Sequence, residues 1–177
     1  MTRTRHLIKH ARPAPTPGVP AHHWPAHPHG LTGVPTLAAR LNPTPGVVIR
    51  SEELKAEQTA AALARTLGVP ARRMLGLHEH LRYTVPCGTQ TDFDARVAEF
   101  FAQPTRCVMG EESADLARAR YHAAVTATMG AHPHPCVAVV AHGTVIRLLA
   151  AHLTGQNAHP LWRHLDFLGH LTVPWPT

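Results

Sequence analysis

Two short apolar segments constrain the fold of this chain most strongly, because each has the length of a buried strand and precedes a helical pattern. Val47–Ile49 and Cys136–Val140 contain no charged residue, as is typical of strands inside a parallel sheet. An amphipathic helix follows the first and ends at Gly68, before a proline. A second helix follows over Thr144–Leu153. Strands that alternate with helices predict an α/β domain with a mostly parallel sheet.

The remaining elements extend this pattern. We expect further strands at Leu7-Ile8, Met74–Leu77 and His170–Val173, and further helices over 34–41, 91–101 and 111–129. Ser51 is expected to cap the helix after the second strand, with Glu52 and Glu53 in its first turn. Residues 13–30 and 82–110 are rich in loop signals. The prediction is a three-layer α/β sandwich, with helices on both faces of the sheet, in a single domain over 1–177.

Composition limits the classes of function. The net charge of +6 admits an anionic partner, but the arginines are scattered and no known binding motif is present, which argues against nucleic acid. Cys87, Cys107 and Cys136 have no C-x-x-C spacing, which argues against a disulfide framework and favours a reducing compartment. No apolar run approaches the roughly 18 residues of a membrane span. We therefore expect a soluble, cytoplasmic protein that does not associate with membranes.

Two of the predicted strands end alike. Leu7-Ile8 leads through Lys9 into His10 and a proline-rich loop, and Val139-Val140 leads into His142 and a helix. The carboxyl ends of parallel strands meet at one edge of a sheet, where ligands of open α/β folds bind. We therefore expect the two histidines to face a common site.

Positive charge is expected at the same edge. Lys9 precedes the first histidine, Lys55 lies in the second turn of the helix after Val47–Ile49, and a helix starts at Gly143. Lysines together with a helix amino terminus suit a dianion such as phosphate. Glu79 follows the predicted strand at 74–77, where its carboxyl group can act as a proton donor.

Five short motifs carry a resemblance to a known family. They are Lys9-His10-Ala11, Ser51-Glu52-Glu53-Leu54-Lys55-Ala56-Glu57-Gln58-Thr59-Ala60, Leu77-His78-Glu79, Gly110-Glu111-Glu112-Ser113 and Val140-Ala141-His142-Gly143. In this order and in this context of strands and helices, the chain resembles the histidine phosphatase (phosphoglycerate mutase-like) superfamily. The family patterns are Arg-His-Gly, Ser-x-x-x-Arg-Ala-x-Gln-Thr-Ala, Leu-x-Glu, Gly-Glu-Ser and Val-x-His-Gly.

The resemblance implies hydrolysis of a phosphomonoester through a phosphohistidine. By this analogy His10 is the nucleophile, Glu79 protonates the leaving oxygen, and His142, Lys9 and Lys55 hold the transferring oxygens. It implies no metal and no organic cofactor. The expected partner is a small phosphorylated substrate or a phosphoprotein.

Three further positions belong to the expected phosphate site. Gly143 opens the helix, Arg12 helps to attract an anion, and Thr16 stands where mutase-like members have an asparagine. A mutase is less expected than a phosphatase, because only about 30 residues separate Glu79 from Glu111 and leave little chain for a lid that excludes water.

Two departures from the family pattern support an alternative. Lys9 and Lys55 replace arginines, and lysine lacks the planar fork that binds phosphate through two hydrogen bonds. The alternative is a catalytically weak or inactive member that binds a phosphorylated ligand. The histidine-rich stretch Ala21–His29 is not predicted to bind metal, because its prolines prevent histidines from sharing a helix face.

Overall fold

The structure, a computed structural model, describes residues 3–85 and 89–175. Within this part of the chain one sheet has the strand order β3-β2-β4-β1-β5. The strands are β1 (Arg3–Lys9), β2 (Val48–Arg50), β3 (Ala71–Arg73), β4 (Cys136–Ala141) and β5 (His170–Trp175). β1 to β4 run parallel, and β5 pairs antiparallel with β1 at one edge.

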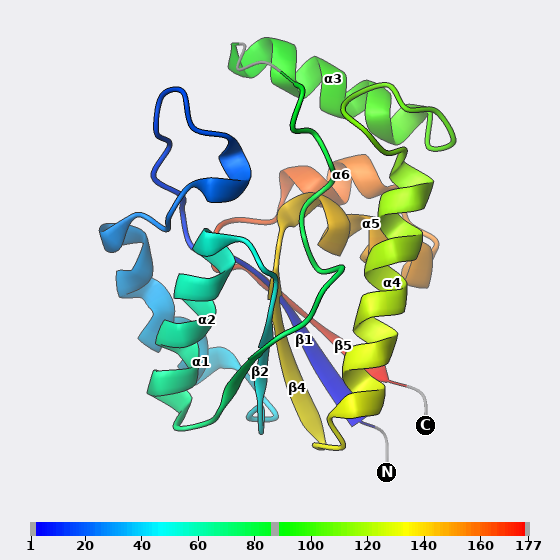
Figure 1. The fold of residues 1–177 in the computed structure, drawn as a ribbon. Helices are drawn as coiled ribbons and strands as arrows, with labels where there is room; N and C mark the ends of the chain where they lie inside the picture. Colours follow the sequence, from blue (N-terminus) through cyan, green and yellow to red (C-terminus); the bar gives the residue numbers. More distant parts are fainter. Residues whose placement is uncertain (1–2, 86–88, 176–177) are drawn as a thin grey trace.

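Helices cover both faces of the sheet (Figure 1). They are α1 (Val34–Arg40), α2 (Leu54–Leu67), α3 (Gln90–Ala102), α4 (Ala114–Ala131), α5 (Gly143–Thr154) and α6 (Ala158–Arg163). In addition, 3₁₀ turns span Ala21–His23 and Pro28–Gly33. α1 and α2 lie on one side of the sheet, and α4 and α5 lie on the other. The predicted three-layer α/β architecture is confirmed.

The strands supply both cores because neighbouring side chains of a strand point to opposite faces. In β1, Leu7 packs in the cluster with α4 and α5, whereas Ile8 packs in the cluster with α1 and α2. β4 alternates in the same way, with Val139 on the first side and Val140 on the second. The central strands are therefore buried on both faces, as their continuous apolar sequences predict.

The strand predicted at Met74–Leu77 is wrong. β3 lies earlier, at Ala71–Arg73, and the chain then makes a turn in which Gly76 has φ of +83°. The ladder continues by one bond, from the Met74 amide to the Arg50 carbonyl. The apolar residues of this segment belong to a loop, whose Leu77 is fully buried in the core. Glu79 therefore lies on this loop and not at the end of a strand.

The predicted cap at Ser51 is also wrong. Glu53 occupies the N-cap position of α2, and neither Glu52 nor Glu53 lies in its first turn. The Ser51 hydroxyl instead contacts the His142 ring, and the Glu53 carboxylate binds the Lys55 amine. The Ser51 hydroxyl also accepts from the Glu53 amide at 3.3 Å, so it is engaged before the helix begins and does not cap it.

The other predicted elements agree with the structure within a few residues at their ends. The helix predicted from 111 begins at Ala114, because the Ser113 hydroxyl caps it by accepting from the Leu116 amide. α6 was not predicted. Cys107 and Cys136 are free thiols, and Cys87 lies outside the described residues. Of the helices in the described ranges, none has the length and hydropathy needed to cross a membrane.

The turn before α4 depends on a glycine. Gly110 has φ of +72°, and a Cβ at this position would lie 2.1 Å from the Leu81 carbonyl oxygen. We predict that Gly110→Ala lowers the free energy of unfolding by more than about 2 kcal/mol, because both the backbone conformation and the close approach oppose a side chain. Urea-induced unfolding measures this change.

Gly130→Ala is the matched control. Gly130 lies in α4, and a Cβ there meets no atom within 4 Å. We expect its stability to be unchanged or raised by up to about 1 kcal/mol. Equal stabilities of the two variants would contradict the proposed dependence on Gly110.

Candidate active site

The two predicted strand-end histidines meet. β1 and β4 are neighbours in register, with Lys9 beside Ala141, so each strand delivers its next residue to the same edge. The ring centroids of His10 and His142 are 5.1 Å apart. Both side chains are buried, and the His10 amide donates to the Ala141 carbonyl at 3.0 Å. The pair is therefore held by the sheet itself.

The hydrogen bond of His10 defines which of its ring nitrogens is free. Nδ1 lies 2.7 Å from the Ala11 carbonyl oxygen, which can only accept, so Nδ1 carries the proton. The lone pair is left on Nε2. Burial, followed by the nearby His142, holds the pKa of His10 well below its ordinary value. The neutral form, which is the nucleophilic one, is thus favoured near neutral pH.

His142 is oriented through one ring nitrogen. Its Nε2 lies 2.9 Å from the Ser51 hydroxyl and 3.5 Å from a carboxylate oxygen of Glu53. Nδ1 is buried and has no protein partner among the described residues. Burial lowers the pKa of His142 to about 4, and the Glu53 charge opposes this effect. The Ser51 hydroxyl accepts from the Glu53 amide at 3.3 Å and can donate to Nε2, so the neutral ring carries its proton on Nδ1 and can donate it to an anion.

Glu53 links three parts of the site. One carboxylate oxygen accepts from the Lys55 amine at 2.5 Å, and the other accepts from the Glu79 amide at 2.8 Å. Burial alone raises the pKa of this carboxyl, but His142 and Lys55 together hold it below its ordinary value. The Lys55 amine also donates to the Ala21 carbonyl at 2.8 Å. The lysine expected to face a substrate is therefore already engaged by the protein.

Glu79 lies against the same cluster. Its carboxylate accepts from the amides of His80 at 2.9 Å and Thr144 at 3.3 Å, the second near the amino terminus of α5. Burial alone raises the pKa of Glu79. The charge of Arg82, the proximity of His142 and the His80 hydrogen bond together lower it to about 2. In the free protein Glu79 is thus a carboxylate across the physiological range.

Lys9 lies at the edge of the site, and its amine is directed toward the segment before β5. Nζ donates to the Leu165 carbonyl at 2.9 Å and lies 4.3 Å from the centroid of the Phe167 ring. Burial lowers the pKa of Lys9, and the charges of Glu79 and Asp166 oppose the shift. The amine remains within electrostatic reach of Glu79 but is anchored to the segment before β5.

The predicted anion-site residues divide into two groups. Gly143 is buried at the first position of α5, and a Cβ there would lie 3.3 Å from Cε of Lys9. Arg12 and Thr16 are exposed on the loop after β1. Within the described part of the chain, no hydrogen bond or ion pair joins either of their side chains to the two histidines.

Sequence reasoning did not identify several neighbours of the site. Glu53 and Ser51 were interpreted as parts of a helix start, and their spacing from Lys55 gave no sign of the long-range contacts. Arg82 influences Glu79 from a loop without a readable pattern, and its Nη1 is buried without a partner in the described residues. Phe167 lies close to His10, with ring centroids 5.7 Å apart.

Two loops meet beside the site. The ring centroid of His22, from the loop after β1, lies 4.3 Å from that of Tyr83 and 4.0 Å from that of His23. Tyr83 follows Glu79 by four residues and is 54% exposed. The loop after β1 and the segment after Glu79 are thus in contact.

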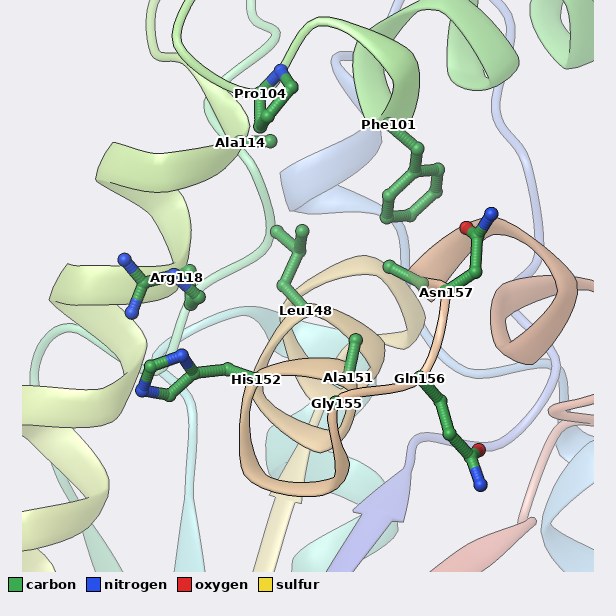
Figure 2. A pocket seen from close by; sticks show the side chains of 11 residues that line it. Phe101, Pro104, Ala114, Arg118, Leu148, Ala151, His152, Gly155, Gln156 and Asn157 are labelled. Carbon is green, nitrogen blue, oxygen red and sulfur yellow. The ribbon is translucent and has the colours of Figure 1, made fainter.

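A separate hollow of about 520 Å³ lies among α3, α4, α5 and α6 (Figure 2). Phe101, Leu148 and Ala151 line its apolar part, and Arg118 and His152 extend from its rim. None of the predicted catalytic residues lines it. We therefore place the chemistry not in this hollow but at the two buried histidines and the carboxylates of Glu53 and Glu79 beside them.

Burial alone would raise the pKa of Glu79, and the charge of Arg82 is the largest of the effects that lower it. We predict that Arg82→Gln raises the pKa of Glu79 toward its ordinary value near 4.5, because the neutral amide removes a stabilising charge. Carbon-13 NMR titration of the Glu79 carboxyl measures the shift. Arg118→Gln, on α4 and paired with Asp115, should leave it unchanged. A Glu79 pKa that is the same in both variants would contradict this attribution.

Comparisons with known proteins identify the family to which the chain is similar. The family model of the histidine phosphatase superfamily, branch 1, matches residues 24–173. This range includes Glu53, Glu79 and His142 and begins after His10. No curated protein matches the chain.

Solved structures share the fold at low sequence identity. Mycobacterial glucosyl-3-phosphoglycerate phosphatase Rv2419c has a TM-score of 0.77 at 20% identity, covering 98% of this chain and 91% of its own. Phosphoserine phosphatase from Entamoeba histolytica has a TM-score of 0.73 at 15% identity, with coverages of 96% and 89%. α-Ribazole phosphatase from Shigella flexneri has a TM-score of 0.69 at 18% identity, with the same coverages. With the family model matched over most of its length, the chain belongs to the histidine phosphatase superfamily.

Proposed function

We propose that this protein is a phosphatase that hydrolyses a small phosphomonoester through a phosphohistidine on His10. The observation that carries the proposal is the meeting of two buried histidines, with ring centroids 5.1 Å apart, beside a carboxylate at the start of a helix. The likeness to three phosphatases supports the fold on which this chemistry depends. Two of those proteins are named for small phosphorylated compounds, glucosyl-3-phosphoglycerate and phosphoserine.

In the first step, Nε2 of His10 attacks the phosphorus atom. A P–N bond forms and the bond from phosphorus to the leaving oxygen breaks, while Glu79 gives that oxygen a proton. His142 Nδ1 donates to a phosphoryl oxygen, and Gly143 adds a backbone amide at the amino terminus of α5. These donors stabilise the charge that develops in the transition state.

In the second step, water hydrolyses the phosphohistidine. The Glu79 carboxylate takes a proton from the water as its oxygen attacks phosphorus, and the P–N bond breaks to restore neutral His10. Splitting one displacement into two is the usual advantage of covalent catalysis. The carbonyl of Ala11 keeps the proton on Nδ1 throughout, so that Nε2 is the nitrogen that reacts.

The low pKa of Glu79 indicates where the first proton comes from. In the free protein the carboxyl is ionised at neutral pH, because its pKa is about 2. The monoanion of a phosphomonoester carries a proton on phosphate. Once bound, this proton passes to Glu79, whose affinity for protons rises beside the phosphoryl charge. The active complex therefore forms from neutral His10, ionised Glu79 and the monoanionic substrate.

A second candidate function is a weak or inactive member that binds a phosphorylated ligand. The observation that favours it is the engagement of Lys55 by Glu53 at 2.5 Å and by the Ala21 carbonyl at 2.8 Å. An amine neutralised in this way contributes less to binding a transferring phosphoryl group than a free arginine fork.

Phosphate release from a panel of phosphomonoesters, without added metal, tests the proposal. We expect turnover by the wild-type protein, a loss of about 10³-fold or more in His10→Ala because the nucleophile is removed, and an acid-labile phosphoenzyme after a rapid quench. His152→Ala is the matched control, since His152 is exposed on α5. Wild-type protein that binds inorganic phosphate but hydrolyses no ester would instead support the second candidate.

The dependence of kcat/KM on pH tests the protonation states assigned to His10, Glu79 and the substrate. For an aliphatic phosphomonoester we expect kcat/KM to fall about tenfold per unit above about pH 6, the second pKa of such phosphates. On the acid side it should fall as His10 becomes protonated, because the protonated ring has no lone pair on Nε2 with which to attack phosphorus. A kcat/KM that stays constant from about pH 5 to 8 would contradict delivery of the proton by the substrate.

A further inference from the structure

The loop of residues 76–84 carries Glu79 but contains no helix or strand. It connects the turn after β3 to the segment before α3, and its backbone polar groups need partners outside regular structure. Glu53 provides one by accepting from the Glu79 amide. The others come from α4 and from the turn that precedes this helix.

Arg120 of α4 holds three consecutive parts of this loop. Nη1 donates to the carbonyls of Gly76 at 2.9 Å and His78 at 3.0 Å, and Nη2 donates to the Glu79 carbonyl at 3.2 Å. The same guanidinium binds both carboxylate oxygens of Glu112, at 2.5 and 3.3 Å. The planar fork of arginine is needed to satisfy these acceptors together.

Glu112 binds a further part of the loop, at His80 and Leu81. Its carboxylate accepts from the Leu81 amide at 2.9 Å, and its backbone carbonyl lies 2.9 Å from Nε2 of His80. The Glu112 side chain is only 7% exposed, and that of Arg120 is 20% exposed. The pair is thus a largely buried ion pair whose remaining hydrogen bonds all point at the loop.

The preceding residues extend the same arrangement. The Glu111 carboxylate accepts from the amides of Tyr83 at 2.9 Å and Thr84 at 2.8 Å, and its own amide donates to the Leu81 carbonyl. The additional glutamate of the Gly110-Glu111-Glu112-Ser113 motif therefore has a structural role, because the two carboxylates hold successive amides of the loop.

We infer that Glu112 and Arg120 form a positioning pair for Glu79. Neither is a catalytic residue, since both act on the backbone of the loop. Glu53 fixes the Glu79 amide and Arg120 fixes the Glu79 carbonyl, so the carboxylate is aimed from both sides. This inference rests on the proposed function, in which Glu79 protonates the leaving oxygen. A displacement of about 1 Å at such a group costs about 100-fold in rate.

Leaving-group dependence separates this role from general destabilisation. A phosphorylated aliphatic alcohol needs protonation of its leaving oxygen, whereas p-nitrophenyl phosphate releases a stable phenolate and needs little. For Arg120→Met we expect kcat/KM to fall about 100-fold with the aliphatic substrate and less than about threefold with p-nitrophenyl phosphate. Equal losses with the two substrates would overturn the inference, because a merely structural defect affects both.

Three further variants complete the design. Arg118→Met, two residues earlier on α4, pairs with Asp115 and should leave both rates unchanged. Arg120→Lys keeps the charge beside Glu112 but cannot reach three carbonyls, so we expect the same selective loss, and it replaces Arg120→Met if that variant fails to fold. Glu79→Gln should show a larger selective loss. If Glu79→Gln is selective and the Arg120 variants are not, the inference fails while the proposed function stands.

Amide hydrogen exchange provides a readout independent of activity. We expect faster exchange of the Leu81, Tyr83 and Thr84 amides in Arg120→Lys than in the wild-type protein or in Arg118→Met. Unchanged exchange would overturn the inference. Wild-type protein that hydrolyses neither substrate would overturn the proposed function and, with it, the catalytic consequence drawn for the pair.

Discussion

Parallel pairing of β1 with β4 is the constraint on which the site depends. The register that aligns Lys9 with Ala141 also aligns the residues that follow, His10 and His142. Both side chains are buried, and the ring of Phe167, from the segment before β5, lies beside that of His10. Burial lowers the pKa of both rings, which keeps the nucleophile neutral. Nδ1 of His142 is free for an anion because it has no protein partner in the described residues.

Carboxylates organise the surroundings of these histidines. Glu53 joins His142, Lys55 and the Glu79 amide, and Glu112 joins Arg120 to the loop that carries Glu79. A buried carboxylate is costly to desolvate unless cations and amides surround it. The carboxylates of Glu53 and Glu112 both have such partners. Together their hydrogen bonds hold the irregular loop that carries Glu79 in one place.

The cations of the site differ in the groups that they bind. Lys9 and Lys55 donate to backbone carbonyls, and Lys55 also neutralises Glu53. Arg82 lies where it lowers the pKa of Glu79 and has a buried nitrogen without a protein partner in the described residues. The two motif positions thus carry lysines, and the guanidinium that acts on Glu79 lies on the same loop as that carboxylate.

The sequence by itself determined the fold class, the order of most elements and the meeting of His10 with His142, because apolar periodicity and strand ends are local properties. It misplaced β3 and the role of Ser51, since loop segments with apolar residues and hydroxyl groups near helix starts have the same local signals as strands and caps. The network through Glu53, Arg82, Glu112 and Arg120 was decided only by tertiary structure. Its long-range contacts join residues from 8 to 89 positions apart, and such contacts leave no periodic pattern in a single sequence.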